Sequence, residues 1–183
     1  GTMGTDGTMQ KYTYSSTKPT GLAGKGVFVQ QSLSEGSDIA FDTSGSNNYY
    51  TSTLRAKIKD GTYFNLSEEE KTLNLAMPRT ISSIKEVSNS SGYQETTTDK
   101  YTLSDSSTDK FWLMSLGEVN TYLGTDNSSR TFNGQYWWLR SPMSGSTNNT
   151  MNVGSSGSLY NYNAINTYCR VRAAFILSTT ASI

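Results

Sequence analysis

Alternating apolar and polar residues predict strands near both ends of the chain. Three segments show this pattern: residues 25–31, 38–43 and 169–177. Side chains two apart share one face of a strand. The apolar face of the last segment contains Val171, Ala173, Phe175 and Leu177. We therefore expect this segment to lie in a core sheet.

Helical spacing and end signals predict two or three short helices. Tyr50, Leu54 and Ile58 recur every four residues, which is typical of an amphipathic helix. Two capping-box pairs predict further helix starts: Ser67 with Glu70, and Ser115 with Glu118. Gly124 should end the helix that begins after Ser115.

The stretches between these helices predict strands and polar loops. Residues 80–88, 111–114 and 135–141 suit strands, and residues 89–98 and 125–134 suit loops. Trp137 and Trp138 are adjacent on one predicted strand, so they should point to opposite faces. One of them should be core. The other could form the floor of a binding surface or fill a second small core.

Composition removes several classes of function. Fifteen basic and fifteen acidic residues cancel, which argues against nucleic acid or an anionic membrane as partner. The chain has no histidine and one cysteine, which excludes His-dependent catalysis and His/Cys zinc sites. The sequence contains no run of about 18 apolar residues, so it predicts no membrane span. We expect a flexible or vector-derived lead-in over residues 1–20 and a single domain over 21–183.

Residues 143–169 carry the candidate chemistry. Seventeen of these 27 residues are Asn, Ser, Thr or Tyr, and none is charged. Antibody paratopes have a similar composition, because Tyr provides contact area and Ser and Asn provide adaptable hydrogen bonds. An ordinary polar loop region is the alternative. Tyr160, Tyr162 and Tyr168 favour binding, because exposed aromatic rings do not help a chain to turn.

Several motifs resemble one bacterial domain family. They are YWWLRSP at 136–142, MNV at 151–153, VRAAFIL at 171–177 and, upstream, YYTSTLRAKI, LSEEEK and FWLMSLGEV. The family reads approximately WLRSP … NV … GVRPAF and is similar to the C-type-lectin-like fold shared with formylglycine-generating enzymes. Its members include variable proteins of diversity-generating retroelements of bacteria and phages. This chain departs from the pattern at Arg170 and Ala173, where the family has Gly and Pro.

The resemblance implies a fold, a function and a set of variable residues. The fold would be α+β and C-type-lectin-like, with a mixed, mostly antiparallel sheet, two or three short helices and a long ordered loop region. The function would be binding of a protein or cell-surface ligand, at a bacterial surface or on a phage particle. Retroelements of this kind randomise template adenines, and Asn codons begin with two adenines. The expected variable residues, within about 143–170, are Ser144, Ser146, Asn148, Asn149, Asn152, Ser158, Tyr160, Asn161, Tyr162, Asn163, Ile165, Asn166, Tyr168 and Cys169.

Other roles follow for the residues around this segment. Trp137, Trp138, Arg140 and Arg172 are expected to support it, the two arginines as paired polar anchors rather than ligand contacts. Catalysis like that of formylglycine-generating enzymes needs two cysteines, and only Cys169 is present. We expect no enzyme activity, metal or cofactor at the site, although a structural calcium near Asp105, Asp109 or Asp126 stays open. A non-diversified bacterial surface or structural module of the same family is the alternative function.

Overall fold

Strands from the two ends of the chain pair in one four-stranded sheet. Its order is β1-β2-β9-β5, with β1 (Gln10–Thr13) parallel to β2 (Gly26–Gln30). β9 (Ala173–Ile176) is antiparallel to both β2 and β5 (Trp112–Leu113). Part of the expected lead-in therefore joins this sheet as β1. The computed structural model describes residues 10–13, 26–30, 38–63 and 76–176, so the predicted helix start at Ser67 and the position of Leu177 lie outside the described residues.

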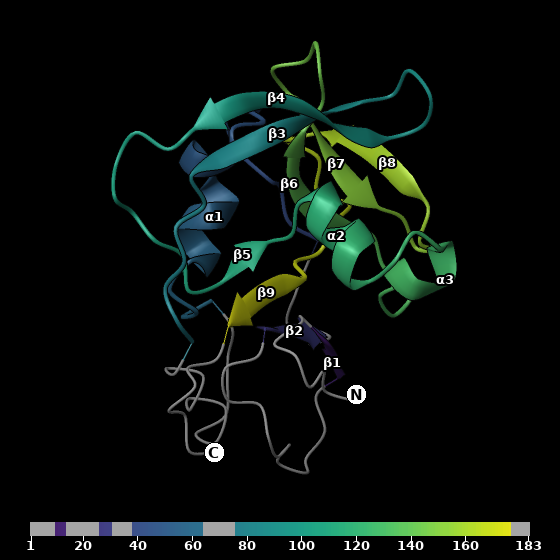
Figure 1. Cartoon of the computed structure of the whole chain (residues 1–183), viewed down its shortest axis with the longest axis horizontal. Helices are drawn as coiled ribbons and strands as arrows, with labels where there is room; N and C mark the ends of the chain where they lie inside the picture. Colours follow the sequence, from purple (N-terminus) through teal and green to yellow (C-terminus); the bar gives the residue numbers. More distant parts are fainter. Residues whose placement is uncertain (1–9, 14–25, 31–37, 64–75, 177–183) are drawn as a thin grey trace.

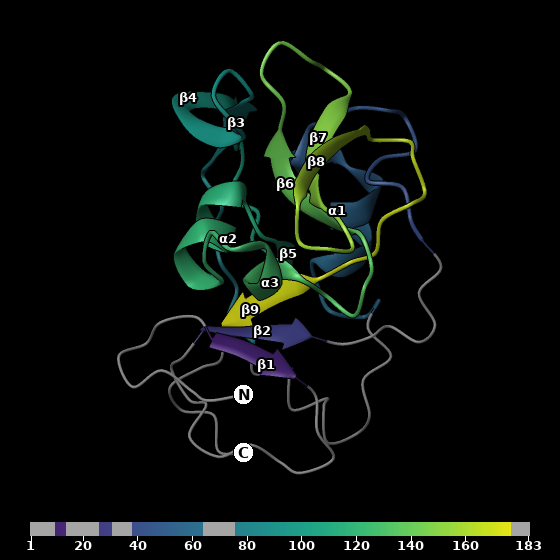
Figure 2. The same ribbon diagram turned by 90° about the vertical axis from the view of Figure 1, so that its right-hand side faces the viewer.

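A hairpin and a second sheet form the rest of the strand architecture. β3 (Ser83–Ser88) and β4 (Gln94–Thr102) make the hairpin. β6 (Trp137–Pro142), β7 (Asn149–Val153) and β8 (Leu159–Asn163) make an antiparallel three-stranded sheet. Figures 1 and 2 show β9, β2 and β1 on one side of the molecule, and the hairpin and the β6–β8 sheet on the other. The architecture is α+β and mostly antiparallel, as predicted.

α2 (Leu116–Tyr122) begins where the capping box predicts, and α1 (Thr53–Ile58) contains two of the three residues spaced as a helix, while Tyr50 lies in the turn before it. In α2, the Ser115 hydroxyl accepts from the Glu118 amide and the Glu118 carboxylate accepts from the Ser115 amide, which confirms the capping box. Gly124 follows the helix with a φ of 101°, a conformation that favours glycine. α1 follows a 3₁₀ turn, η1 (Tyr49–Thr51), and buries Leu54 and Ile58 as its spacing predicts.

Four sequence predictions of loops and strands are wrong. Residues 38–43 form no strand, although the Ile39 and Asp42 amides donate to the carbonyls of Cys169 and Ala164. The predicted loop at 89–98 contains the start of β4, and the one at 125–134 contains α3 (Asn127–Arg130). The long loop region at 143–169 contains β7 and β8. β7 and β8 are rich in polar residues, so the sequence does not indicate strands there. Pairing with neighbouring strands stabilises them despite their low apolar content.

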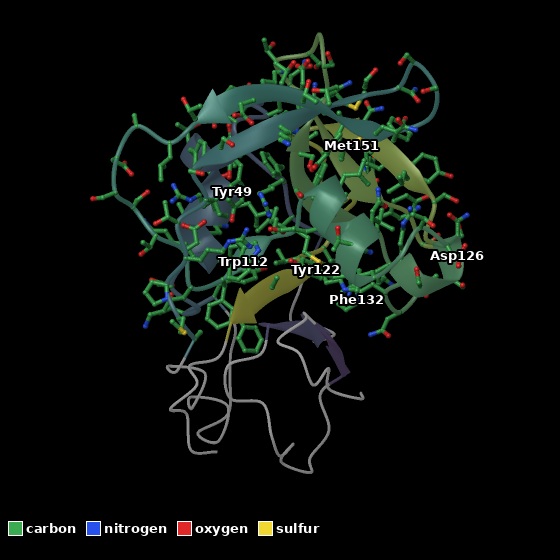
Figure 3. All side chains as sticks on the ribbon, in the orientation of Figure 1. Tyr49, Trp112, Tyr122, Asp126, Phe132 and Met151 are labelled. Carbon is green, nitrogen blue, oxygen red and sulfur yellow. The ribbon has the colours of Figure 1, made fainter. Side chains whose placement is uncertain are left out.

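The core fills with aromatic rings from several elements, among them Tyr49 and Trp112 (Figure 3). Trp137 and Trp138 are both fully buried and belong to the same core. Trp138 packs edge-on against Phe41 and donates from Nε1 to the Ile39 carbonyl, while the Nε1 of Trp137 donates to the Arg130 carbonyl. Neither tryptophan forms the floor of an exposed surface, because both indoles are covered.

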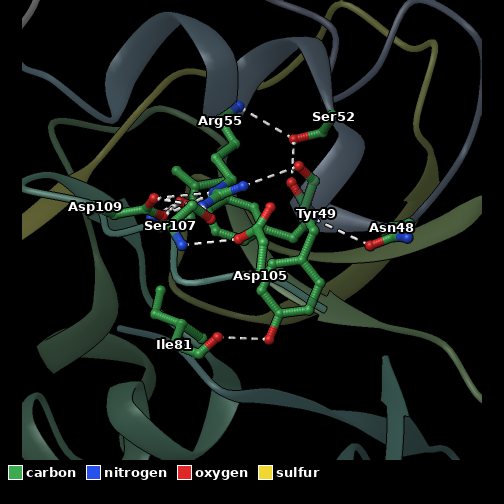
Figure 4. A network of polar contacts seen from close by, with 10 residues as sticks. Asn48, Tyr49, Ser52, Arg55, Ile81, Asp105, Ser107 and Asp109 are labelled. Atoms are coloured by element: carbon green, nitrogen blue, oxygen red, sulfur yellow. Dashed lines mark hydrogen bonds and ion pairs between the residues drawn. The ribbon is translucent and has the colours of Figure 1, made fainter. Parts of the chain in front are cut away.

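A buried ion pair fixes α1 against the loop before β5 (Figure 4). The Arg55 Nε lies 3.0 Å from both carboxylate oxygens of Asp109, and the Arg55 Nη2 donates to the Ser107 hydroxyl. The backbone of Asp109 pairs in turn with that of Arg79. The Asp109 carboxylate is thus used inside the fold, and no group of three His, Cys, Asp or Glu side chains within the described residues could hold a metal ion.

The two arginines expected to act as paired anchors differ. Arg140 Nη1 lies 2.5 Å from the Glu118 carboxylate and donates to the Leu113 carbonyl. Arg172 has no carboxylate partner among the described residues. The central carbon of its guanidinium lies 4.7 Å from the ring centroid of Trp137 and 5.3 Å from that of Phe132. Its Nη1 donates to the Arg130 carbonyl, but its buried Nε and Nη2 have no hydrogen-bond partner in the described part of the chain. The prediction of an ion-paired anchor is therefore wrong for Arg172, because within the described residues its guanidinium contacts two aromatic rings and one carbonyl but no carboxylate.

Arg172→Met should stabilise the domain by about 1–2 kcal/mol in urea unfolding at neutral pH. Burial lowers the pKa of Arg172 to about 10, so the group is still charged at pH 7, and no described residue places an anion beside this buried charge. Methionine keeps an unbranched chain beside the two rings and removes that charge. Arg140→Met is the matched control and should destabilise, because it leaves Glu118 without its closest cation. A loss of stability in Arg172→Met comparable to that of the control would contradict the prediction.

Candidate functional site

The β7–β8 register decides which side chains of the candidate segment share a face. Tyr160 lies opposite Asn152, and Tyr162 lies opposite Thr150. Asn152 also lies opposite Trp138 on β6. Directly opposite residues of an antiparallel pair point to the same face, so Tyr160 and Tyr162 extend the face on which Trp138 is buried. Their strand, β8, is at the edge of the sheet, where this face is less covered.

Four tyrosines meet on this face, and we call them the tyrosine cluster: Tyr136, Tyr160, Tyr162 and Tyr168. The ring of Tyr136 lies 6.1 Å from that of Tyr160 and is stacked 5.9 Å from that of Tyr162. Tyr162 meets Tyr168 edge-on at 6.2 Å. These separations are typical of favourable aromatic pairs. The cluster joins the start of β6, the edge strand β8 and the segment after β8 into one surface.

The four tyrosines of the cluster differ in exposure: two are exposed enough to contact a ligand, and two are partly buried and support them. Tyr160 and Tyr168 are 41% and 66% exposed, and nearby in the chain Ile165 is 53% exposed. Tyr136 and Tyr162 are partly buried and pack against the core. Burial, followed by the neighbouring Tyr136 hydroxyl, raises the pKa of Tyr162. Its hydroxyl therefore stays protonated at neutral pH and can donate a hydrogen bond.

Gly154 gives the tyrosine cluster its close packing. A Cβ at this position would lie 2.6 Å from Cε2 of Tyr160 and 3.3 Å from Cε1 of Tyr136. Any side chain at position 154 would therefore displace the Tyr160 ring. The absence of a side chain, rather than an unusual φ, is the reason for glycine here.

The other end of the candidate segment is a turn held by buried polar groups. Asn47 donates from Nδ2 to the carbonyls of Ser146 and Asn149 and from its backbone amide to that of Thr147. Tyr101 donates its hydroxyl to Asn47 Oδ1. The Lys100 ammonium donates to the carbonyls of Met143 and Ser146. The turn from β6 to β7 is thus fixed by residues from before α1 and from β4.

A family model for a domain of unknown function, DUF6273, matches residues 24–179. The chain belongs to the DUF6273 family. The match extends from just before β2 to just after β9, so the DUF6273 domain includes the whole tyrosine cluster. Comparison with curated proteins found no match, and comparison with solved structures found none. Within the described part of the DUF6273 domain, no helix has the length and apolar character needed to cross a membrane.

The remaining expected contacts are spread over both turns of the sheet and over both of its faces. Ser144, Ser146, Asn148 and Asn149 lie in or beside the β6–β7 turn, and Ser158 lies in the β7–β8 turn, where its hydroxyl accepts from Asn127. Asn161 points to the opposite face from the tyrosines and donates to the Tyr93 hydroxyl. Asn163, the last residue of β8, and Asn166, which follows the strand, are both partly exposed. The structure brings Tyr160, Tyr162 and Tyr168 together, but it does not gather every expected residue at one point.

Asn152 and Cys169 cannot contact a ligand in this structure, because both are fully buried. Asn152 lies on the central strand of the sheet, between Trp138 and Tyr160, and its amide has no hydrogen-bond partner among the described residues. The carbonyl of Cys169 accepts from Ile39, and burial raises the pKa of its thiol. These two predicted contacts of the DUF6273 domain are wrong, because composition does not reveal which face of a strand is covered.

Tyr136 is the cluster member that sequence reasoning missed. It precedes Trp138 by two residues, so the alternation of the strand places both on one face. That spacing alone could have indicated Tyr136 as a neighbour of the binding surface. Asn47 and Lys100 were also missed, and nothing local in the sequence connects them to the turn that they hold.

Proposed function

We propose that this DUF6273 domain binds a protein or cell-surface ligand through the tyrosine cluster. The observation that carries the proposal is the contiguous, uncharged surface of Tyr160, Tyr162, Tyr168 and Tyr136 on ordered backbone. Tyrosine is enriched in binding hot spots, because it offers a large amphipathic area with few rotatable bonds. A surface that is already ordered loses little conformational entropy on binding.

We further propose that the domain is a C-type-lectin-like variable protein of a diversity-generating retroelement. The mixed, mostly antiparallel sheets and short helices are compatible with such a fold. The exposed positions of Tyr160, Ile165 and Tyr168 support diversification, because their side chains can change without loss of core packing. Asn152 and Cys169 do not support it, since replacement at a buried site would disturb the core.

The coding DNA tests diversification directly. We expect a nearby, near-identical repeat of the segment that encodes residues 143–170, next to a reverse-transcriptase gene, with differences only at template adenines. Substitutions among sibling genes should fall on exposed positions. A gene without such a repeat, whose siblings vary equally in core and surface codons, would instead favour a non-diversified surface or structural module.

Tyr160→Ala combined with Tyr168→Ala should abolish binding while leaving the fold intact. Tyr168 is 66% and Tyr160 41% exposed, so the free energy of unfolding should change by only about 1 kcal/mol for each replacement. Binders can be selected from a displayed library of protein domains on the immobilised wild-type chain, and their affinity for each variant measured. We expect at least a roughly hundredfold loss, the size of effect typical of two hot-spot residues.

Two further variants make this test specific. Tyr122→Ala removes a tyrosine of similar exposure, 38%, from α2, outside the cluster, and should leave binding unchanged. Gly154→Ala keeps every tyrosine but displaces the Tyr160 ring, and it should weaken binding. If the selected binders have the same affinity for the Tyr160→Ala, Tyr168→Ala double variant as for the wild type, the proposed site is contradicted.

A further inference from the structure

β8 is an edge strand, and no other strand of the described residues pairs with its outer side. At its end, the Asn163 carbonyl accepts from the Asn166 amide. The sheet order is β6-β7-β8, so β7 covers only one side of β8. The Gly154 amide donates to the Ser158 carbonyl, and the Ala164 amide donates to the Asn148 carbonyl. Hydrogen bonding alternates along an antiparallel pair, so residues 158, 160, 162 and 164 turn their backbone groups toward β7. Leu159, Asn161 and Asn163 therefore turn theirs outward.

This edge lacks the features that usually prevent strand pairing. Its sequence, LYNYN, has no charge and no proline, and its register with β7 is regular over five residue pairs. Lysine, proline and bulges are the common protections of sheet edges. The Asn161 side chain is held at both ends, by Tyr93 and by Asn149, so it lies against its own domain. The outward amide and carbonyl of Asn161 have no hydrogen-bond partner among the described residues.

We propose that two copies of this chain form a dimer by antiparallel pairing of β8 with β8 about a two-fold axis at Asn161. In this register Asn161 lies opposite Asn161 of the second copy, and Leu159 lies opposite Asn163. Tyr160 then lies opposite Tyr162, on the face of the tyrosine cluster. The outward amide and carbonyl of Asn161 meet those of the second copy at the axis, and the Asn163 amide meets the Leu159 carbonyl on either side of it. The Asn163 carbonyl already accepts from the Asn166 amide in its own chain.

Three properties of the edge favour a second copy as its partner. The residues from 143 to 169 carry no charge, so no like charges meet across the axis. Each copy presents a strand that is already ordered. The Tyr160–Tyr162 pairs continue the ring contacts that each cluster makes internally, and aromatic pairs across a strand pair are stabilising. The result is a six-stranded sheet with both tyrosine clusters on one face. This dimer is independent of the proposed ligand.

Sedimentation velocity over a wide range of chain concentrations tests the dimer. We expect the wild type to reach twice the chain mass as concentration rises. Asn161→Pro removes the amide donor at the axis, and proline is tolerated at an edge position whose amide faces outward. It should raise the dimer dissociation constant at least about tenfold. Asn161→Ala is the matched control, because it loses the contact with Tyr93 but keeps the backbone amide, and it should dimerise like the wild type.

Hydrogen exchange on the wild type gives a second measurement that needs no variant. The amides of Asn161 and Asn163 should exchange fast at concentrations where the chain is monomeric and slowly where it is dimeric. A wild type that stays monomeric at every concentration would overturn the proposal. So would a dimer in which the Asn161 amide exchanges as fast as in the monomer, or an Asn161→Pro variant that folds and dimerises with wild-type affinity.

Discussion

Glu118→Gln should destabilise the domain by about 3–5 kcal/mol at neutral pH, because it leaves the buried Arg140 guanidinium without its anion. The Glu118 carboxylate lies 2.5 Å from Arg140 and 2.8 Å from Arg79, and it also completes the capping box of α2. Glutamine can still accept from the Ser115 amide, so the capping contact is largely kept. The loss would come from the charge. Urea unfolding followed by circular dichroism measures it.

The pH dependence of this loss provides a sharper test. Burial by itself would raise the pKa of Glu118, but the charge and hydrogen bonds of Arg140, the charge of Arg79 and the Ser115 amide lower it to about 2. A carboxyl group with a lowered pKa in the fold contributes its full stabilisation above its ordinary pKa of 4.5 and loses it as pH falls toward 2. The difference between wild type and Glu118→Gln should therefore shrink across this range.

Glu86→Gln is the control for the loss of an acidic residue as such. The Glu86 carboxylate accepts from the Ser144 hydroxyl in an exposed contact, so its replacement should change stability by less than about 1 kcal/mol. Equal losses in the two variants, or a Glu118→Gln difference that stays constant from neutral pH down to pH 2, would contradict the assignment of Glu118 as the partner of a buried cation.

Asn47→Ala should destabilise the domain by about 2–3 kcal/mol and loosen the β6–β7 turn. The Asn47 side chain is fully buried and makes three hydrogen bonds, to the carbonyls of Ser146 and Asn149 and to the Tyr101 hydroxyl. Alanine leaves these groups buried without that partner, and an unsatisfied buried polar group is more costly than the net value of its bond. Unfolding in urea and hydrogen exchange of residues 143–149 measure the two effects.

Asn148→Ala is the matched control, because it removes an exposed amide from the same turn. The Asn148 Oδ1 accepts from the Ser146 hydroxyl at the surface, so its loss should change stability by less than about 1 kcal/mol. If hydrogen exchange in the turn is as slow in Asn47→Ala as in the wild type, Asn47 does not anchor the turn.

Local signals in the sequence determined much of the fold. The capping box of Ser115 and Glu118, the glycine stop at Gly124 and the buried face of α1 are set by residues within a few positions of one another. Such patterns act through short-range hydrogen bonds and helical spacing, so they predict an element without knowledge of its neighbours. The exposure of Tyr160 and Tyr168 was also predicted from local sequence, because aromatic residues among Asn, Ser and Thr do not help a chain to turn.

Only the tertiary structure decided which polar residues form strands and which are buried. β7 and β8 read as loop in the sequence, because their pairing partners and the rings that cover them come from distant segments. The same dependence on neighbours buries Asn152 and Cys169, places the Arg172 guanidinium against aromatic rings and brings Tyr136 to Tyr162. Burial is a property of two surfaces in contact, so one strand's sequence specifies its alternation but not which of its faces the fold will cover.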